Sequence, residues 1–108
     1  MWLALSEGFL SIVGHRDKPE HLLVRARNRK HLRRAFPNAE IYFNPLADYP
    51  FRADILREDV ISFISKRMSM MTYDNFKNTI GEERYHDAAI RIWETMYDYG
   101  RPHRSDEE

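Results

Sequence analysis

Apolar side chains near the start of the chain fall into short runs separated by polar turns. Residues 2–5 and 9–13 are two such runs, rich in strand-forming residues, and Gly8 lies in the connection between them. A short connection with glycine between two runs of this kind predicts a β-hairpin. Residues 22–27 then alternate between apolar and basic side chains, which predicts a strand with one buried face and one basic, solvated face.

The next segments predict a helix followed by two further strands. Asn28 is suited to cap the start of a helix, and Pro37 ends it. Residues 40–44 contain strand-forming side chains, and residues 51–55 alternate between apolar and polar ones. We therefore expect a fourth and a fifth strand at these two places.

Beyond residue 55 the period of the apolar side chains becomes helical. One stripe is expected to face the core, and it consists of Val60, Ile61, Ile64, Met68 and Met71. Met70 lies off this stripe and is expected to be exposed. Asp74 predicts the N-cap of a short helix over residues 75–80. Residues 85–99 repeat apolar side chains at steps of four and three, which predicts a last helix.

The predicted element order is β-β-β-α-β-β-α-α-α. It indicates an α+β fold, in which an antiparallel sheet of about five short strands carries the helices on one face. The 108 residues suit one domain, which we place at residues 1–101, with residues 102–108 as a short polar tail. The first apolar run is shorter than the core of a signal peptide, and no run approaches the length of a membrane span. We therefore expect a cytoplasmic protein.

Several segments, taken in order along the chain, carry a resemblance to a known family. They are Gly8–Val13, His15–Arg27, Tyr49-Pro50-Phe51-Arg52, Tyr73-Asp74-Asn75-Phe76-Lys77, Tyr85-His86, Ile92-Trp93 and Met96-Tyr97. The chain is similar in these segments to a family of small uncharacterised bacterial and phage proteins. The resemblance implies a stand-alone cytoplasmic domain, and it implies no particular activity or catalytic residue.

Composition removes several classes of protein. The 17 basic and 17 acidic residues give a net charge of zero, which excludes both a polycation that coats nucleic acid and an acidic mimic of DNA. The lack of cysteine excludes disulfides, thiolate metal sites and a cysteine nucleophile. Neither a phosphate-binding glycine loop nor a serine-hydrolase motif occurs, and the five histidines lack metal-binding spacing. We predict no metal and no cofactor.

The basic residues are nevertheless concentrated in one segment. Residues 15–34 contain eight basic and two acidic side chains, and arginine supplies most of the positive charge. Arginine favours bidentate contacts with phosphate or carboxylate groups. We therefore predict a binding surface on one strand, the following helix and a nearby loop, formed by Arg16, Arg25, Arg27, Arg29, Lys30, Arg33, Arg34 and Arg52.

Two kinds of partner fit this surface. With a protein partner, the chain is a small non-catalytic interaction protein, such as a phage-encoded inhibitor of a host or defence protein. With nucleic acid as the partner, the chain is a nucleic-acid-binding protein that uses the same basic surface. The enzymatic form of this hypothesis is a metal-independent RNase with His15 or His31 as its base. No aromatic residue lies between His15 and Ala35, so the sequence favours the protein partner.

Two further interpretations of the charged residues stay open. The arginines can pair with acidic side chains of the C-terminal half, either in the same chain or across a homodimer. Asn75 and Lys77, at the start of the short helix predicted there, form a secondary candidate for contact with an anion.

Overall fold

The computed structural model describes residues 1–101, and the polar tail predicted at residues 102–108 lies outside the described residues. The chain divides into a first unit, residues 1–73, and a second unit that begins at Asp74. We describe the two units in turn. No helix among residues 1–101 combines the length and the apolar character needed to cross a membrane.

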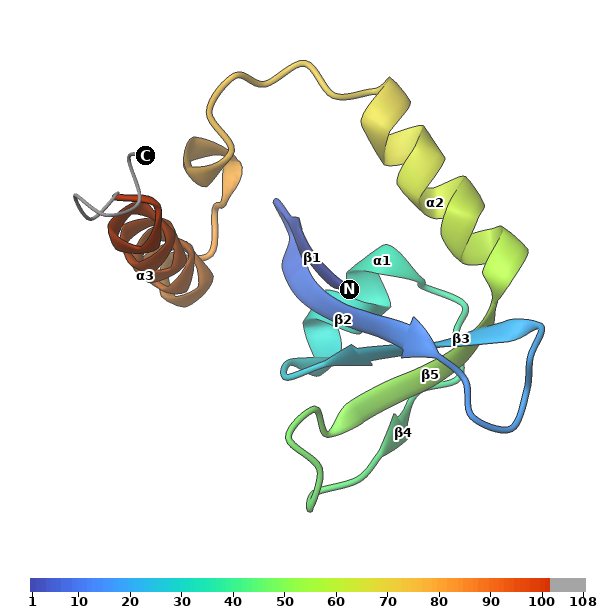
Figure 1. Cartoon of the computed structure of the whole chain (residues 1–108). Helices are drawn as coiled ribbons and strands as arrows, with labels where there is room; N and C mark the ends of the chain where they lie inside the picture. The colour runs from blue at the N-terminus through green and yellow to red at the C-terminus, as the bar shows by residue number, and fades with distance from the viewer. Residues whose placement is uncertain (102–108) are drawn as a thin grey trace, which may run out of the picture. The chain divides into compact units, whose positions relative to one another are not determined.

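The first unit is built on a five-stranded antiparallel sheet with the strand order β1-β2-β3-β5-β4 (Figure 1). The strands are β1 (Trp2–Leu5), β2 (Gly8–Gly14), β3 (His21–Ala26), β4 (Tyr42–Phe43) and β5 (Phe51–Leu56). The hairpin predicted at the start of the chain is confirmed as the β1–β2 pair. The fourth strand is shorter than predicted: it pairs with β5 only at Tyr42 and Phe43, and a turn begins at Asn44.

Two helices cover one face of this sheet. The helix α1 (Arg29–Ala35) begins at the predicted N-cap, where Oδ1 of Asn28 accepts the N–H of Lys30 at 2.9 Å. The helix α2 (Arg57–Ser69) directly follows β5. The buried core on this face consists of Leu10, Ile12, Val24, Ala26, Leu32, Ala35, Ala53, Ile55 and Val60. The predicted α+β class with an antiparallel sheet is thereby confirmed.

The close approach of α1 to β2 depends on Gly8. A Cβ atom at this position would lie 2.6 Å from both Cβ and Cγ of His31, and 2.9 Å from its Cα. The His31 ring is buried, and its Nδ1 accepts the N–H of Phe9 at 3.1 Å. The glycine therefore allows the helix to lie directly against the strand.

The apolar stripe predicted for α2 is only partly buried. Val60 lies in the core, but Ile61, Met68 and Met71 are exposed. The prediction that Met68 and Met71 belong to the core is wrong, because the helix packs on the sheet through the half around Val60. Met70 is exposed, as predicted.

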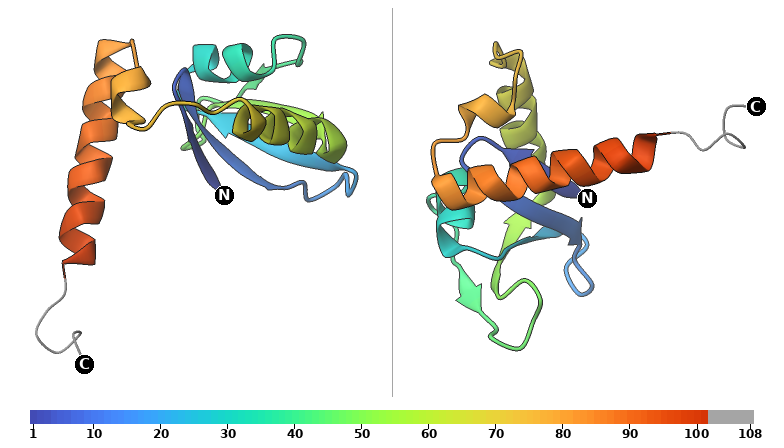
Figure 2. Two further views of the ribbon diagram at one scale, coloured as in Figure 1. Left: turned by 90° about the horizontal axis from the view of Figure 1, so that it is seen from above. Right: turned by 90° about the vertical axis from the view of Figure 1, so that its left-hand side faces the viewer.

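The second unit contains the short 3-10 helix η1 (Lys77–Thr79) and the helix α3 (Glu83–Gly100). The helix predicted over residues 85–99 is confirmed as α3, which is uninterrupted in both views of Figure 2. Tyr85 and Ala89 of its apolar stripe are buried, whereas Ile92, Met96 and Tyr99 are exposed.

The helix predicted over residues 75–80 is reduced to the single turn η1. Asp74 does not cap it, because the residue at the N-cap position is Phe76, whose side chain makes no capping bond. Instead, Oδ1 of Asn75 accepts the N–H of Asn78 at 3.4 Å. Such a local bond from an asparagine side chain competes with the backbone bonds of a longer helix.

Candidate functional site

Within residues 1–73 no helix covers the second face of the sheet, which we call the open face. Side chains alternate along each strand, so the neighbours of the core residues point to this face. Cross-strand pairing places one residue of each strand in a row across it. The row consists of Trp2 on β1, Ser11 on β2, Arg25 on β3, Arg52 on β5 and Tyr42 on β4.

Arginine side chains gather on the open face around the ring of Tyr49. The guanidinium carbons of Arg25 and Arg27 lie 4.8 Å and 4.2 Å from the centroid of this ring. Arg52 donates from Nε to the carbonyl oxygen of Tyr49 at 3.2 Å. The Tyr49 side chain is buried, so cation–π contacts with its ring hold the two guanidinium groups in fixed positions. We call Arg25, Arg27 and Arg52 the arginine cluster.

The arginine cluster has no acidic partner in the first unit. The ion pairs within residues 1–73 join Asp54 to His15 and Lys18, and Glu7 to Arg67. Arg25 donates from Nη2 to the neutral hydroxyl of Ser11 at 2.7 Å, and it lies directly opposite Arg52. Because like charges at opposed positions repel, an anion bound between these side chains relieves an unfavourable interaction.

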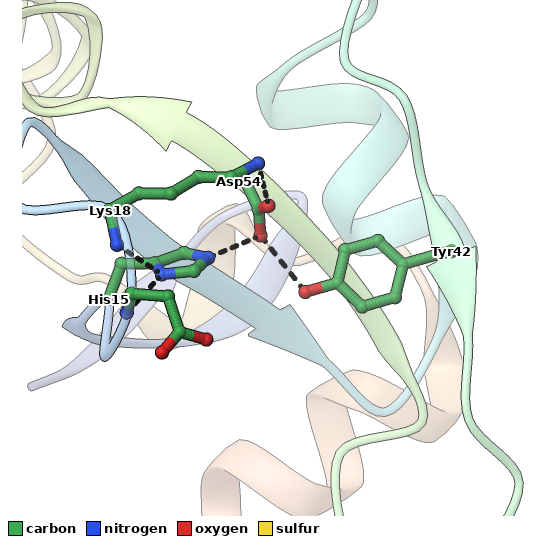
Figure 3. A network of polar contacts seen from close by, with 5 residues as sticks. His15, Lys18, Tyr42 and Asp54 are labelled. Atoms are coloured by element: carbon green, nitrogen blue, oxygen red, sulfur yellow. Dashed lines mark hydrogen bonds and ion pairs between the residues drawn. The ribbon is translucent and has the colours of Figure 1, made fainter.

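A polar network lies on the same face as the cluster, since Asp54 follows Arg52 by two residues on β5; Figure 3 shows the network itself. Asp54 is its centre, since its carboxylate accepts the ammonium of Lys18 at 2.9 Å and the hydroxyl of Tyr42 at 2.9 Å. Nε2 of His15 lies 3.2 Å from the same carboxylate. This network joins the β2–β3 loop to β5 and β4.

The network shifts the pKa values of two of its members in opposite directions. Burial raises the pKa of the Asp54 carboxyl, but the hydrogen bonds from Lys18, Tyr42 and His15 outweigh burial, so its pKa lies below the ordinary value. For Tyr42, burial and the bond to the Asp54 carboxylate both raise the pKa of the hydroxyl. The network is therefore suited to an ionised Asp54 and a neutral Tyr42.

Neither histidine proposed as a nuclease base is placed for that role. Nδ1 of His15 accepts the N–H groups of Asp17 and Lys18, each at 3.1 Å. Its Nε2 therefore carries the proton and donates to Asp54, which leaves no nitrogen to accept one. His31 lies buried against β2. Both rings hold backbone segments together, and their geometry gives the nuclease alternative no support.

The structure separates the predicted basic residues of α1 from the arginine cluster. They belong to the helix-covered face, because α1 packs on the core. Arg33 donates to the carbonyl oxygens of Pro37 and Ala39, and Arg34 donates to that of Glu7. Arg29 lies over the ring of Phe51, with 5.2 Å between its guanidinium carbon and the ring centroid. Lys30 and Arg16 are exposed.

The secondary candidate lies in the second unit. Lys77 places its ammonium 4.3 Å from the centroid of the Trp93 ring, and Asn75 bonds to the backbone of η1. Both residues thus have partners within their own unit. Since η1 is a single turn, it offers no row of free N–H groups for an anion.

Sequence reasoning missed the aromatic residues of the open face. Trp2, Phe9 and Tyr42 are distant from the arginines in sequence, and strand pairing brings them to the same face. The ring centroids of Trp2 and Phe9 are 6.0 Å apart. Side chains alternate along residues 2–5, so Trp2 points to the face opposite that of Leu3. This alternation is the sequence signal for an aromatic ring on the open face.

In the described part of the chain, no three His, Asp or Glu side chains gather in a way that could hold a metal ion. Comparisons of the chain with protein-family models, curated proteins and solved structures give no match. The resemblance to small bacterial and phage proteins therefore stays a prediction.

Proposed function

We propose that this chain is a cytoplasmic, non-catalytic nucleic-acid-binding protein and that the open face of its sheet holds the ligand. The observation that carries the proposal is the arginine cluster, with which no carboxylate of residues 1–73 forms an ion pair. Arginine guanidinium groups bind phosphate oxygens in a bidentate manner. The open face thus offers fixed positive groups to a phosphate backbone.

Exposed rings beside the cluster favour nucleic acid over an acidic protein. No aromatic residue lies within the basic segment of the sequence. The fold nevertheless brings Trp2 and Tyr42 into one row with Arg25 and Arg52. Positive groups interleaved with aromatic rings are typical of nucleic-acid-binding surfaces. An acidic protein segment can pair its carboxylates with the arginines, but those carboxylates do not stack on the exposed rings.

Charge reversal on the open face tests this proposal. In Arg27→Glu, an exposed guanidinium of the cluster is replaced by a carboxylate, and binding to a labelled oligonucleotide is expected to weaken about tenfold or more. The wild-type affinity is expected to fall with salt, with a slope of about −2 in log K against log salt, because about three phosphates are contacted. Fluorescence anisotropy at two salt concentrations measures both effects.

Lys30→Glu is the matched control, since it makes the same charge change at an exposed site on the helix-covered side. Its affinity for the oligonucleotide is expected to stay within about twofold of wild type. Equal losses in both variants would show that net charge, and not the open face, drives binding. Thermal melting of each variant separates a loss of binding from a loss of fold.

A protein partner is the second candidate, and a different surface favours it. A groove of about 760 Å³ lies along β1 and α2 in the first unit. Leu3, Phe63, Met68 and Met70 are among its apolar lining residues, and methionine adapts to varied apolar partners. If an inhibitor-like function uses this groove, Met70→Lys will abolish partner binding while Arg27→Glu leaves it intact.

A further inference from the structure

We infer that the ligand of the open face is a single-stranded nucleic acid that runs across the strands, with a base stacked on Trp2 and phosphates held at Arg25 and Arg52. This inference rests on the proposed function and names the form of nucleic acid that the face accepts. It depends on the aromatic residues at the two ends of the row, whereas the proposed function depends on the arginines at its centre.

The rings at both ends of the row are accessible. Trp2 on β1 is 73% exposed and Tyr42 on β4 is 44% exposed. The ring of Phe9 supports the indole of Trp2 from one side, in a tilted arrangement. The hydroxyl of Tyr42 is held by Asp54, which fixes the direction of its ring. Both rings are therefore positioned before a ligand arrives.

The charges lie between these rings. Arg25 and Arg52 form a direct cross-strand pair at the centre of the row, and Arg27 lies next to them over the ring of Tyr49. With strands about 4.8 Å apart, the row from β1 to β4 spans about 19 Å. A ligand that uses the whole row must therefore present aromatic faces at its ends and anionic groups between them. A chain of nucleotides has this arrangement.

A duplex does not offer the same groups to a sheet. Its base faces are closed by stacking inside the helix, and it presents phosphates and groove edges only. Exposed aromatic side chains gain stacking energy from bases that are already unpaired. The aromatic ends of the row therefore favour a single strand, whereas the arginines alone do not distinguish between the two forms.

The emission of Trp2 provides a direct test. The chain has two tryptophans, so Trp93→Phe leaves Trp2 as the only one. This variant of the full chain is titrated with an oligouridylate of about 12 nucleotides, a length within the usual site sizes of such surfaces. The same strand annealed to its complement and a polyglutamate peptide form the other arms. We expect quenching of Trp2 by the single strand and at least tenfold weaker binding of the duplex.

Two substitutions of exposed tryptophans form a matched pair in the full chain. Trp2→Ala removes the stacking ring from the open face and is expected to weaken single-strand binding about tenfold. Trp93→Ala removes the other exposed tryptophan, which is 50% exposed and belongs to the second unit, and is expected to change the affinity by less than twofold. Anisotropy of a labelled oligouridylate measures both.

The outcomes separate this inference from the proposed function. Duplex binding as tight as single-strand binding, or an unchanged affinity in Trp2→Ala, overturns the single-strand inference and leaves the proposed function standing. Absence of binding to both forms at low salt overturns the proposed function itself. Binding of polyglutamate without binding of either nucleic acid overturns both and identifies an acidic protein segment as the occupant.

Discussion

At the scale of single residues, Asp54 joins segments that are distant in sequence. Its carboxylate holds Lys18 and His15 from the β2–β3 loop and Tyr42 from β4. The backbone N–H groups bonded to His15 orient the imidazole toward this carboxylate. One aspartate thus positions both the loop and the short edge strand that supplies the last aromatic ring of the open face.

The network predicts a stability that depends on pH at both ends of the range. The lowered pKa of Asp54 means that its contribution is present above about pH 4 and is lost as the pH falls through its folded value. The raised pKa of Tyr42 means that its contribution is present below about pH 10 and is lost as the pH rises through its folded value. Wild type is therefore expected to melt at a higher temperature than Asp54→Asn at neutral pH.

Thermal melting of the two proteins across the pH range checks this prediction. The difference in melting temperature is expected to narrow toward acid pH, where Asp54 is protonated, and toward alkaline pH, where Tyr42 ionises. Other carboxylates titrate alike in both proteins, so they cancel in the difference. A difference that stays constant from acid to alkaline pH would contradict the assigned role of the Asp54 charge.

At the scale of elements, strands were easier to predict from the sequence than the surface they form. The alternation of residues 22–27 correctly placed Val24 and Ala26 in the core and Arg25 on the other face. The same alternation implies that arginines on α1, which packs on the core face, cannot share a surface with Arg25. Residues that are neighbours in sequence are not neighbours in space here, because the sheet lies between Arg25 and the arginines of α1.

Strand order explains the remaining part of the site. The insertion of β5 between β3 and β4 brings Arg52 beside Arg25 and Tyr42 beside Arg52. Such long-range pairing leaves no local signal in a single sequence, because it depends on which strands share an edge. The place of Tyr42 on the open face could not be predicted for this reason.

The packing of α1 on β2 gives a prediction at the same scale. In Gly8→Ala, the new Cβ would lie within 3 Å of both the side chain and the backbone of His31, so the helix must move away from the strand. We expect a loss of about 1–3 kcal/mol in the free energy of unfolding, measured by urea denaturation.

Gly14→Ala serves as the control for this substitution. It lies at the other end of β2, where an added Cβ meets no atom within 4 Å. Its free energy of unfolding is expected to stay equal to wild type or to rise slightly, because alanine restricts the unfolded chain. A similar loss in both variants would mean that β2 needs glycine for its backbone and that the proximity of His31 is unimportant.

At the scale of the whole molecule, the net charge of zero conceals two units of opposite charge. Residues 1–73 contain twelve basic and eight acidic side chains, whereas residues 74–108 contain five basic and nine acidic ones. The arginine cluster belongs to the first unit, so the unit that carries the candidate site is itself basic. The acidic side chains of residues 74–108 lower the positive electrostatic potential of the whole chain, so they weaken its long-range attraction for an anionic ligand.

The division into units predicts how a shortened chain behaves. Residues 1–73 contain the whole sheet, α1, α2 and the core between them, so this fragment is expected to unfold cooperatively by itself. Because the fragment lacks the acidic unit, it is expected to bind an oligonucleotide roughly two- to fivefold more tightly than the full chain at low salt. The two affinities are expected to converge at high salt, where charges separated by more than a Debye length no longer interact.

Anisotropy titrations of both proteins over a salt series measure the effect, with circular dichroism to confirm the fold of the fragment. A folded fragment that binds more weakly than the full chain at every salt concentration would show that residues beyond Tyr73 contribute contacts to the ligand.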